Sequence, residues 1–323
     1  MSRRTRLSHP ASRALLGRRS GERAETPVRL ARNTGSAKPR KGRRPSWPND
    51  MPKAHDVLVA VLLAGFAPGL ARAHEPIFGI GPRTIWKNGF GLETEFERER
   101  EEVENVWSLR EEILYGITAD VALTLEIPYL LEKSDGRSQA SGFGDTMLRG
   151  KWRFYRKEVW GGIYHAAILG GVEFPTGKTS GVALGSGSYD YFTGLAGAYE
   201  GRRWLNFGAV RYRFNTADKT GFARPDVFLY DAAVGFRPVL TEYTQPDVVL
   251  MFEINGEVFG KARRNGDPVA GTGGDRMFGS FGVWFTYRNW AFTPGVQFPL
   301  VQNMGPLRQQ RDFRAVFAVE FHL

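Results

Sequence analysis

The sequence of 323 residues contains no cysteine and only five histidines. The absence of cysteine excludes both a disulfide framework and a thiolate metal site. No run of 18 apolar residues occurs beyond the N-terminal region, so no membrane-spanning helix is predicted there. A disulfide-stabilised fold and a helical membrane protein are therefore both excluded.

The chain also lacks net charge over most of its length, although its formal charge is +10. Residues 1–50 hold 14 of the 44 basic residues and 3 of the 34 acidic ones, which leaves 30 basic and 31 acidic residues after position 50. A nucleic-acid function inferred from the basic pI would depend on the first fifty residues alone. No nucleic-acid partner is therefore expected.

The N-terminal region divides into two segments. Residues 1–50 are rich in Arg, Ser, Pro and Gly, which predicts a disordered basic extension. A transit peptide is one alternative, and a translation start that really lies at Met51 is another. Residues 51–73 have the form of a signal peptide, with a basic start, an apolar core and a small-residue exit ending at Ala73. Cleavage there would leave residues 74–323 as the exported domain.

The rest of the chain consists of long segments in which apolar and polar residues alternate. In residues 146–154 small, aliphatic and aromatic residues alternate with Met, Arg and Lys, and residues 164–174 repeat the alternation after a short polar break. A period of two predicts β-strands, and about ten residues suit a strand that crosses a membrane at a tilt. The apolar face would contact lipid, and the polar face would line an enclosed interior.

The alternation predicts an all-β fold, a transmembrane antiparallel up-and-down β-barrel of about twelve strands. The expected strands are 88–98, 105–117, 119–130, 143–155, 160–174, 189–200, 204–214, 227–237, 247–259, 277–287, 290–298 and 312–323. The last one is amphipathic and ends at the carboxyl terminus, and closure of the barrel would leave no strand edge unpaired.

The connections support a bacterial outer-membrane barrel, because short turns alternate with long polar loops. The expected long loops are 131–142, 175–188, 215–226, 260–276 and 299–311. Two connections depart from this rule: 99–104 is short for a loop, and 238–246 is long for a turn.

Glu111 does not fit the pattern. It shares the register of Leu109 and Ile113, which should face lipid, and a carboxylate at mid-membrane is costly. A β-bulge near Glu111 would turn the side chain away from the lipid. The alternative is that the predicted register is wrong at this point.

The polar faces of the strands supply the residues expected to line the lumen. They are Glu93, Glu95, Glu97, Glu126, Arg149, Lys151, Arg153, Arg211, Arg213, Glu253, Glu257, Arg314 and Glu320. If acidic and basic residues line opposite walls of one pore, their field would orient a polar solute. The alternative is that the charges pair with one another and fill the interior, because a twelve-stranded barrel is closer in size to filled eight-stranded barrels than to open sixteen-stranded ones.

No enzyme motif is present in a suitable context. Residues 171–179 resemble a phosphate-binding loop, but five residues separate Gly171 from Gly177 where the motif requires four. No nucleophile motif and no pair of histidines at metal-ligand spacing occurs in the exported domain. We therefore expect no enzyme activity, no cofactor and no metal. An outer-membrane lipid hydrolase stays open as an alternative, without identified residues.

Several motifs in the middle of the chain follow one another in a fixed order. They are S-G-F-G-D at 141–145, K-W-R-F at 151–154, G-V-E-F-P-T-G at 171–177 and L-G-S-G-S-Y-D-Y at 184–191. With these motifs and its C-terminal strand, the chain resembles, over residues 77–323, a family of bacterial outer-membrane proteins grouped as transporters of the phenol meta-cleavage pathway. The resemblance implies an outer-membrane barrel and passive uptake of small solutes, with aromatic compounds as candidates.

The same motifs also have an architectural explanation. Asp145 follows glycines and can bond nearby backbone, which would set the start of a strand. Pro175 would end the next strand, because proline cannot donate to the ladder. Tyr189 and Tyr191 suit an aromatic girdle at the membrane boundary. These residues are therefore explained without a ligand.

The sequence thus predicts a protein of the bacterial outer membrane, surrounded by lipid, through which small solutes, aromatic or hydrophobic compounds among them, diffuse passively. A closed, plugged barrel with a structural or binding role is the main alternative.

Overall fold

The computed structural model describes residues 75–242 and 245–323. The predicted basic extension 1–50 and the signal peptide 51–73 lie outside the described residues. Between 75 and 242 and from 245 onwards, no helix is long and apolar enough to cross a membrane. The ordered elements in these ranges are β-strands.

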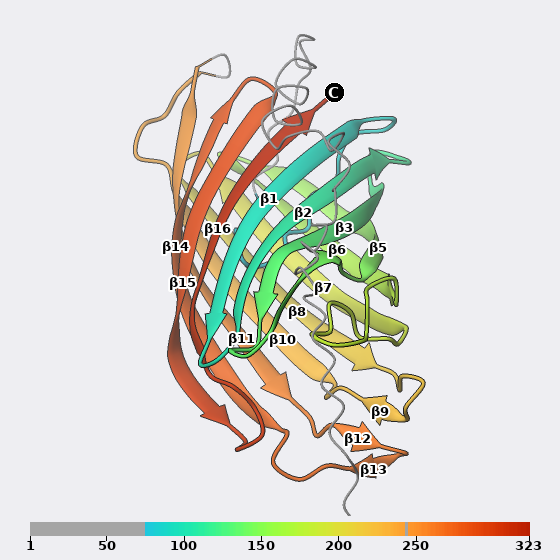
Figure 1. Cartoon of the computed structure of the whole chain (residues 1–323). Helices are drawn as coiled ribbons and strands as arrows, with labels where there is room; N and C mark the ends of the chain where they lie inside the picture. The colour runs from blue at the N-terminus through green and yellow to red at the C-terminus, as the bar shows by residue number, and fades with distance from the viewer. Residues whose placement is uncertain (1–74, 243–244) are drawn as a thin grey trace, which may run out of the picture. The chain divides into compact units, whose positions relative to one another are not determined.

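Twelve long strands form the wall of a closed antiparallel barrel (Figure 1). They are β1 (Phe90–Glu101), β2 (Asn105–Gly116), β3 (Val121–Ser134), β5 (Thr146–Val159), β6 (Gly162–Phe174), β7 (Asp190–Gly201), β8 (Trp204–Asn215), β10 (Val227–Phe236), β11 (Asp247–Phe259), β14 (Gly274–Tyr287), β15 (Trp290–Met304) and β16 (Arg311–His322). Each long strand pairs with the next one along the chain, and β1 pairs with β16 to close the ring. The predicted transmembrane barrel is confirmed.

Four short strands lie near the long connections. β4 (Gln139–Phe143) pairs with the second half of β3, while β5 pairs with the first half. β9 (Phe222–Ala223), β12 (Arg263–Arg264) and β13 (Asp267–Pro268) form a small separate sheet.

Three of the predicted loops are therefore shorter than expected. The range 131–142 contains the end of β3 and most of β4, the range 260–276 ends inside β14, and the range 299–311 begins inside β15. The strands continue because their backbone still finds partners beyond the alternating segment. β15, for example, pairs with β14 as far as Met304.

The two ends of the barrel differ in their connections. At one end the turns 160–161, 202–203 and 288–289 contain two residues each, and Gly161 and Arg288 take positive φ values of 81° and 54°. β16 also finishes there (Figure 1). We call this the short-turn end, which faces the periplasm in bacterial outer-membrane barrels. The opposite, long-loop end carries the longer connections.

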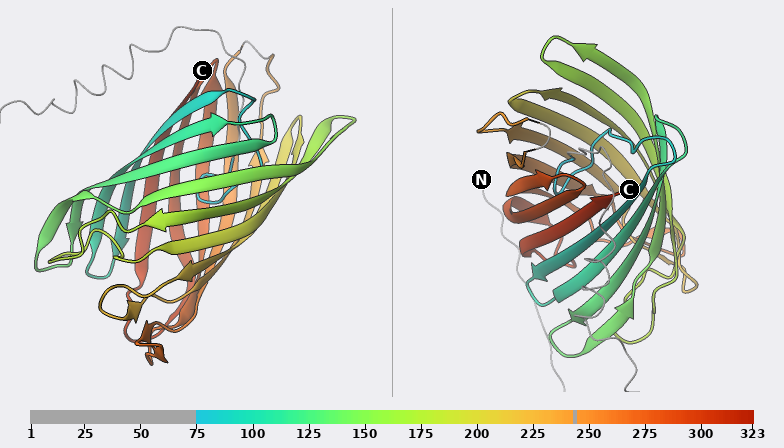
Figure 2. Two further views of the ribbon diagram at one scale, coloured as in Figure 1. Left: turned by 90° about the vertical axis from the view of Figure 1, so that its right-hand side faces the viewer. Right: turned by 90° about the horizontal axis from the view of Figure 1, so that it is seen from above.

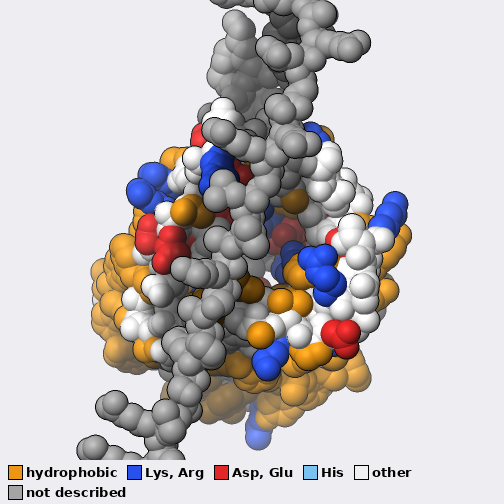
Figure 3. Space-filling model, turned by 60° about the horizontal axis from the view of Figure 1, so that its bottom comes forward, with side chains coloured by type: hydrophobic (Ala, Val, Ile, Leu, Met, Phe, Trp, Pro, Cys, Tyr) orange, Lys and Arg blue, Asp and Glu red, His pale blue; other side chains and the backbone are white. Residues whose placement is uncertain are grey.

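Large apolar side chains cover the outside of the barrel. On β5, Trp152 and Phe154 are exposed, whereas Arg149 and Lys151 of the same strand line the interior. Figure 3 looks toward the long-loop end and shows hydrophobic side chains around the outside, with charged ones near the central hollow. A surface of this kind suits lipid, whereas a water-soluble barrel would carry polar residues outside.

Glu111 stays on the outward face, so the prediction that a bulge turns it inward is wrong. Its neighbours Arg110 and Glu112 both line the interior, which shows that the alternation is unbroken. The pairing of β2 with β3 does shift, but the extra residue is Leu131 of β3. Glu111 instead accepts a hydrogen bond from the hydroxyl of Thr94 (2.8 Å), which lies opposite it on β1.

Candidate functional site

One side of the interior is lined by charged residues of β1, β2 and β3. Arg110 lies in the middle of this side and forms ion pairs with Glu95 (3.1 Å), Glu97 (2.7 Å) and Glu126 (3.4 Å). Charges removed from water are tolerated when they are paired in this way. Arg110 therefore offsets part of the negative charge of these three carboxylates.

Ion pairs continue around the wall on β5 and across the closing seam. Arg149 binds Glu112, and Arg153 binds Asp120 at 2.7 Å. Arg314 of β16 binds a carboxylate of β1, so the same kind of contact joins the first and last strands. Most of the charges expected to face a pore are thus paired along one wall.

The pairing extends to the long-loop end. The Arg276 guanidinium lies 2.6 Å from Glu257 and 3.0 Å from Glu101. On the other side of the barrel, Arg211 of β8 pairs with Asp231 of β10 at 2.7 Å.

Part of the other side of the interior is apolar. One cluster of buried side chains comes from β7, β8, β10, β11, β14 and β15. It consists of Ala198, Leu205, Phe207, Ala233, Val249, Met251, Trp284 and Ala291. A second cluster joins Leu169, Ala196 and Ala209 to Ile80. The interior is therefore amphipathic: charged residues line one side, and the other side combines these apolar clusters with charged groups such as Arg211 and Asp231.

The segment that precedes β1, residues 75–86, lies inside the barrel (Figure 2). Ile77 packs against the first apolar cluster and Ile80 belongs to the second. Two wall glycines leave room for it: a Cβ at Gly282 would lie 2.2 Å from Ile77, and one at Gly295 would lie 2.8 Å from the same residue. The lumen segment, as we call residues 75–86, therefore packs against both apolar clusters.

Polar contacts hold the lumen segment at several points. The Glu253 carboxylate accepts hydrogen bonds from the successive backbone amides of Ile77, Phe78 and Gly79. At the start of the segment, Glu75 binds Lys151 through its side chain and accepts a bond from the Trp284 indole (2.7 Å) through its carbonyl. Farther along, Arg83 binds Glu200 at 2.6 Å.

Among the cavities of the described part of the chain, two lie beside the lumen segment. The larger, of about 430 Å³, lies toward the short-turn end, and the smaller, of about 110 Å³, lies toward the long-loop end. Phe78, Arg211 and Arg314 line both of them. The Phe78 ring lies 5.5 Å from the Arg314 guanidinium, so these two side chains stand between the cavities.

The sequence-predicted lumen residues divide into three groups. Those that line the larger cavity are Glu93, Glu95, Arg149, Lys151, Arg153, Arg211, Arg314 and Glu320. Glu257 lines the smaller cavity, together with Arg211 and Arg314. Glu97, Glu126, Arg213 and Glu253 line neither cavity, and each binds another interior group.

Several interior residues are not among those predicted from the sequence. Arg110 and Glu112 alternate with Leu109 and Ile113, so the period of two in β2 could have revealed them. The lumen segment gave no such signal, because residues 75–86 contain prolines and glycines and do not alternate. Across the described ranges, no group of three or more His, Asp or Glu side chains is arranged to hold a metal ion.

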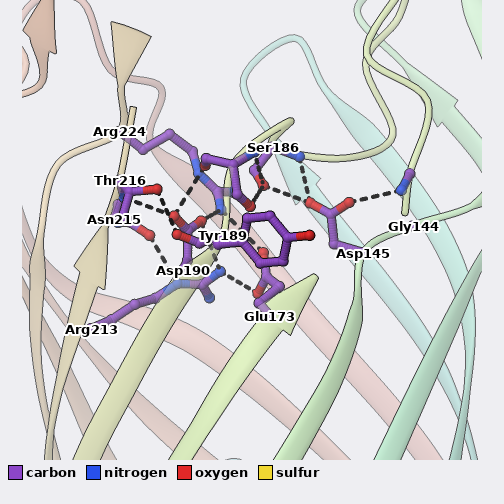
Figure 4. Close-up of polar contacts among 12 residues, drawn as sticks. Gly144, Asp145, Glu173, Ser186, Tyr189, Asp190, Arg213, Asn215, Thr216 and Arg224 are labelled. Atoms are coloured by element: carbon purple, nitrogen blue, oxygen red, sulfur yellow. Dashed lines mark hydrogen bonds and ion pairs between the residues drawn. The ribbon is translucent and has the colours of Figure 1, made fainter. Parts of the chain in front are cut away.

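The motifs shared with the outer-membrane family meet at the long-loop end (Figure 4). Asp145 accepts hydrogen bonds from the Gly177 amide (2.8 Å) and from the amide and hydroxyl of Ser186. A Cβ at Gly185 would lie 2.3 Å from the Asp145 carboxylate, so glycine is required there. Asp145 therefore holds the loop between β6 and β7, which is distant in sequence. The prediction that it bonds nearby backbone is wrong.

A second network holds the far end of the same loop (Figure 4). Asp190 binds Arg224 and accepts a hydrogen bond from the Thr216 amide (2.9 Å). Glu173 binds both Arg224 (3.1 Å) and Arg213. Burial disfavours the charge on Arg224, but its hydrogen bonds and electrostatic attraction to Asp190 and Glu173 together outweigh this and raise the pKa of the guanidinium above its ordinary value. These motifs organise the mouth of the barrel.

The comparisons with known proteins agree with this architecture. Residues 73–304 match the family described as "Putative MetA-pathway of phenol degradation". The COG4313 outer membrane channel from Pseudomonas putida F1 is similar in structure, with a TM-score of 0.60 and 13% identity over 78% of this chain and 100% of that chain. The NanC porin gives a TM-score of 0.45 and 10% identity over 72% of this chain and 100% of that one. No curated protein sequence matches significantly.

Identities this low show a shared fold and nothing finer, whereas the family match rests on the sequence itself. It spans the lumen segment, the loop motifs and all the long strands except β16. The chain therefore belongs to the outer-membrane family described as "Putative MetA-pathway of phenol degradation".

Proposed function

We propose that the protein is a channel of the outer membrane that takes up small solutes passively, and that aromatic or hydrophobic compounds are the class it admits. The observation that supports this class is the lining of the larger cavity, which combines apolar side chains such as Ile80 and Trp284 with charged ones such as Arg149. An aromatic solute with one polar group could place its ring against the apolar side chains and its polar group against the charged ones. The similar structure from Pseudomonas putida F1 is that of an outer membrane channel, which is consistent with the proposal.

The path we propose runs from the long-loop end through the smaller cavity, past Phe78 and into the larger cavity. Because Phe78 lines both cavities, its ring limits what passes between them. The paired charges of the wall would act as local dipoles and would contribute little net field along the path. We therefore expect selection by shape and polarity more than by net charge.

Replacing Phe78 with alanine tests this path. We expect Phe78→Ala to raise single-channel conductance in planar bilayers several-fold, because it removes the side chain between the cavities. Liposome swelling should be faster in isotonic phenylalanine than in isotonic glutamine, two zwitterions of similar size that differ in the polarity of their side chains. Phe317→Ala, on the exposed outer face of β16, is the matched control and should leave both readouts unchanged.

Absence of conductance and swelling in both the wild type and Phe78→Ala would contradict a channel. That outcome would favour a second function, a plugged barrel with a structural or binding role, which the position of the lumen segment inside the wall also suits. Swelling that is equally fast in phenylalanine and glutamine would leave the channel standing and contradict the aromatic preference.

We also propose that residues 51–73 direct export of the protein and are cleaved off after Ala73 on its way to the outer membrane. Mass spectrometry of the barrel from an outer-membrane fraction should then find His74 as the first residue. The lumen segment begins directly after this position, so the proposed cleavage would free it to enter the barrel. A mature protein that keeps residues 51–73 would contradict the proposal.

A further inference from the structure

Three neighbouring turns at the short-turn end form one surface. They are 160–161, 202–203 and the connection after β10, of which residues 237–242 and 245–246 are described. The Arg202 amide donates to the Gly161 carbonyl (3.2 Å), and the Arg237 amide donates to the Arg203 carbonyl (2.8 Å). In the view from above in Figure 2, these turns follow one another along the rim. Direct hydrogen bonds thus hold them in a fixed arrangement.

This surface exposes large apolar side chains. The Trp160 side chain projects from its turn with a relative exposure of 102%, and Trp204, Val239 and Leu240 are exposed by 53%, 65% and 42%. A group of exposed apolar side chains of this size marks a surface that contacts something other than water. Tryptophan in particular is enriched where an apolar phase meets a polar one.

The same turns carry an excess of positive charge. Lys157, Arg202 and Arg203 are exposed, and none of them forms an ion pair within the described chain. The acidic residues Glu158 and Asp247 are already paired, at 2.9 and 2.7 Å, with other arginines. Glu242 is the third acidic residue here, and Lys157, Arg202 and Arg203 outnumber it, so a net positive charge faces outward.

We call Lys157, Trp160, Arg202, Arg203, Trp204, Val239 and Leu240 the rim patch. We propose that the rim patch binds the headgroups of acidic phospholipids in the membrane leaflet that faces the periplasm. This site is independent of solute passage, because none of its residues lines either interior cavity.

Continuity with the lipid-facing wall favours a lipid over a protein partner. Trp204 points outward, since its neighbour Leu205 is buried inside. Its ring lies tilted against that of Phe236 on the outer wall, with 4.7 Å between the ring centroids. The apolar part of the patch therefore continues the surface that contacts acyl chains, and the cations lie beyond it. A phospholipid presents the same order of acyl chain and then phosphate, and basic residues beside an apolar face are how proteins attract acidic headgroups.

The test is to titrate the purified, delipidated barrel with phosphatidylglycerol or phosphatidylcholine of the same acyl chains and to count bound lipids by native mass spectrometry. We expect the wild type to prefer phosphatidylglycerol. Arg202→Ser with Arg203→Ser should weaken its binding by roughly five-fold for each cation removed and leave phosphatidylcholine binding unchanged. Arg288→Asn, on another turn of the same end, is the matched control and should bind like the wild type, because asparagine tolerates the positive φ at this position.

Single-channel conductance equal to that of the wild type would show that the double variant is folded. Equal phosphatidylglycerol binding by the wild type and the folded double variant would overturn the proposal. Equal losses in the double variant and in Arg288→Asn would also overturn it, because binding would then follow net charge alone. A photo-crosslinker at position 160 provides a second measurement in whole outer membranes: capture of phospholipid supports the site, and capture of a protein instead overturns it.

Discussion

At the scale of single residues, Glu111 shows how the lipid-facing wall accommodates a carboxylate. Its side chain points outward from the middle of β2, and the Thr94 hydroxyl donates to both carboxylate oxygens (3.0 and 2.8 Å). This contact offsets only part of the cost of an acidic group in lipid, since one hydroxyl replaces a full hydration shell. The residue therefore reduces the stability of the barrel in a bilayer.

We predict that Glu111→Leu stabilises the barrel by about 1 kcal/mol, because acidic residues on the lipid face are destabilising even though they cost less than Arg or Lys. The measurement is urea-induced unfolding in phospholipid vesicles. Ile127→Leu, at the position paired with Glu111 on β3, is a volume-conserving control. A loss of stability in Glu111→Leu would show that the carboxylate has a favourable contact outside this chain.

Asp145 acts through a loop that follows it by about thirty to forty residues. Three donors from Gly177 and Ser186 converge on its carboxylate, and bonds to a charged acceptor are stronger than neutral ones. We predict that Asp145→Ala destabilises the loop by about 2 kcal/mol and makes residues 175–188 sensitive to limited proteolysis. Proteolysis followed by mass spectrometry measures this directly.

Asp135→Ala is the control for that experiment. Its carboxylate also accepts two backbone hydrogen bonds, but both come from its own turn, from Arg137 (2.9 Å) and Ser138 (2.8 Å). It should leave residues 175–188 as resistant as in the wild type. Equal resistance of Asp145→Ala would show that the networks around Asp190 alone hold the loop.

At the scale of elements, the lumen segment belongs to no strand of the barrel sheet. It is held by side-chain contacts, among which the Glu253 carboxylate binds three successive amides. An anionic group that accepts from consecutive backbone amides fixes the chain locally without any secondary structure. Release of this one contact should therefore loosen the segment while the wall stays intact.

We predict that Glu253→Ala speeds hydrogen exchange at the amides of Ile77, Phe78 and Gly79 by at least ten-fold, which corresponds to about 1.4 kcal/mol. Exchange in the long strands should not change. Glu257→Ala is the matched control on the same strand, because its partner is Arg276 and it does not contact the segment. Unchanged exchange in Glu253→Ala would show that the apolar contacts alone hold the segment.

At the scale of the whole molecule, the barrel could be predicted from the sequence because a period of two leaves few alternatives. Each segment such as 146–154 has only one apolar face that can contact lipid. The number of such segments long enough to cross the membrane predicts the approximate number of strands. The position of Arg149 and Lys151 in the interior follows from the same alternation of apolar and polar residues. These features depend on local pattern alone.

The contacts inside the barrel could not be predicted in that way. The alternation of residues along β1 and β2 shows that Glu97 and Arg110 face inward. It does not show that the two form an ion pair, since this depends on the register between the strands. The lumen segment is harder still, because its apolar residues have no periodicity and its partners lie on β11 and β14. The prediction for Asp145 is wrong for the same reason, because its hydrogen-bond partners are distant in sequence.

The seam between β1 and β16 has a consequence for how the protein is made. It places Gly91 opposite His322, and the ion pair between Glu97 and Arg314 spans 217 positions. β16, the last of the barrel strands in chain order, is thus the one that closes the ring. Any chain cut short before β16 keeps two bare backbone edges, the condition that promotes edge-to-edge aggregation.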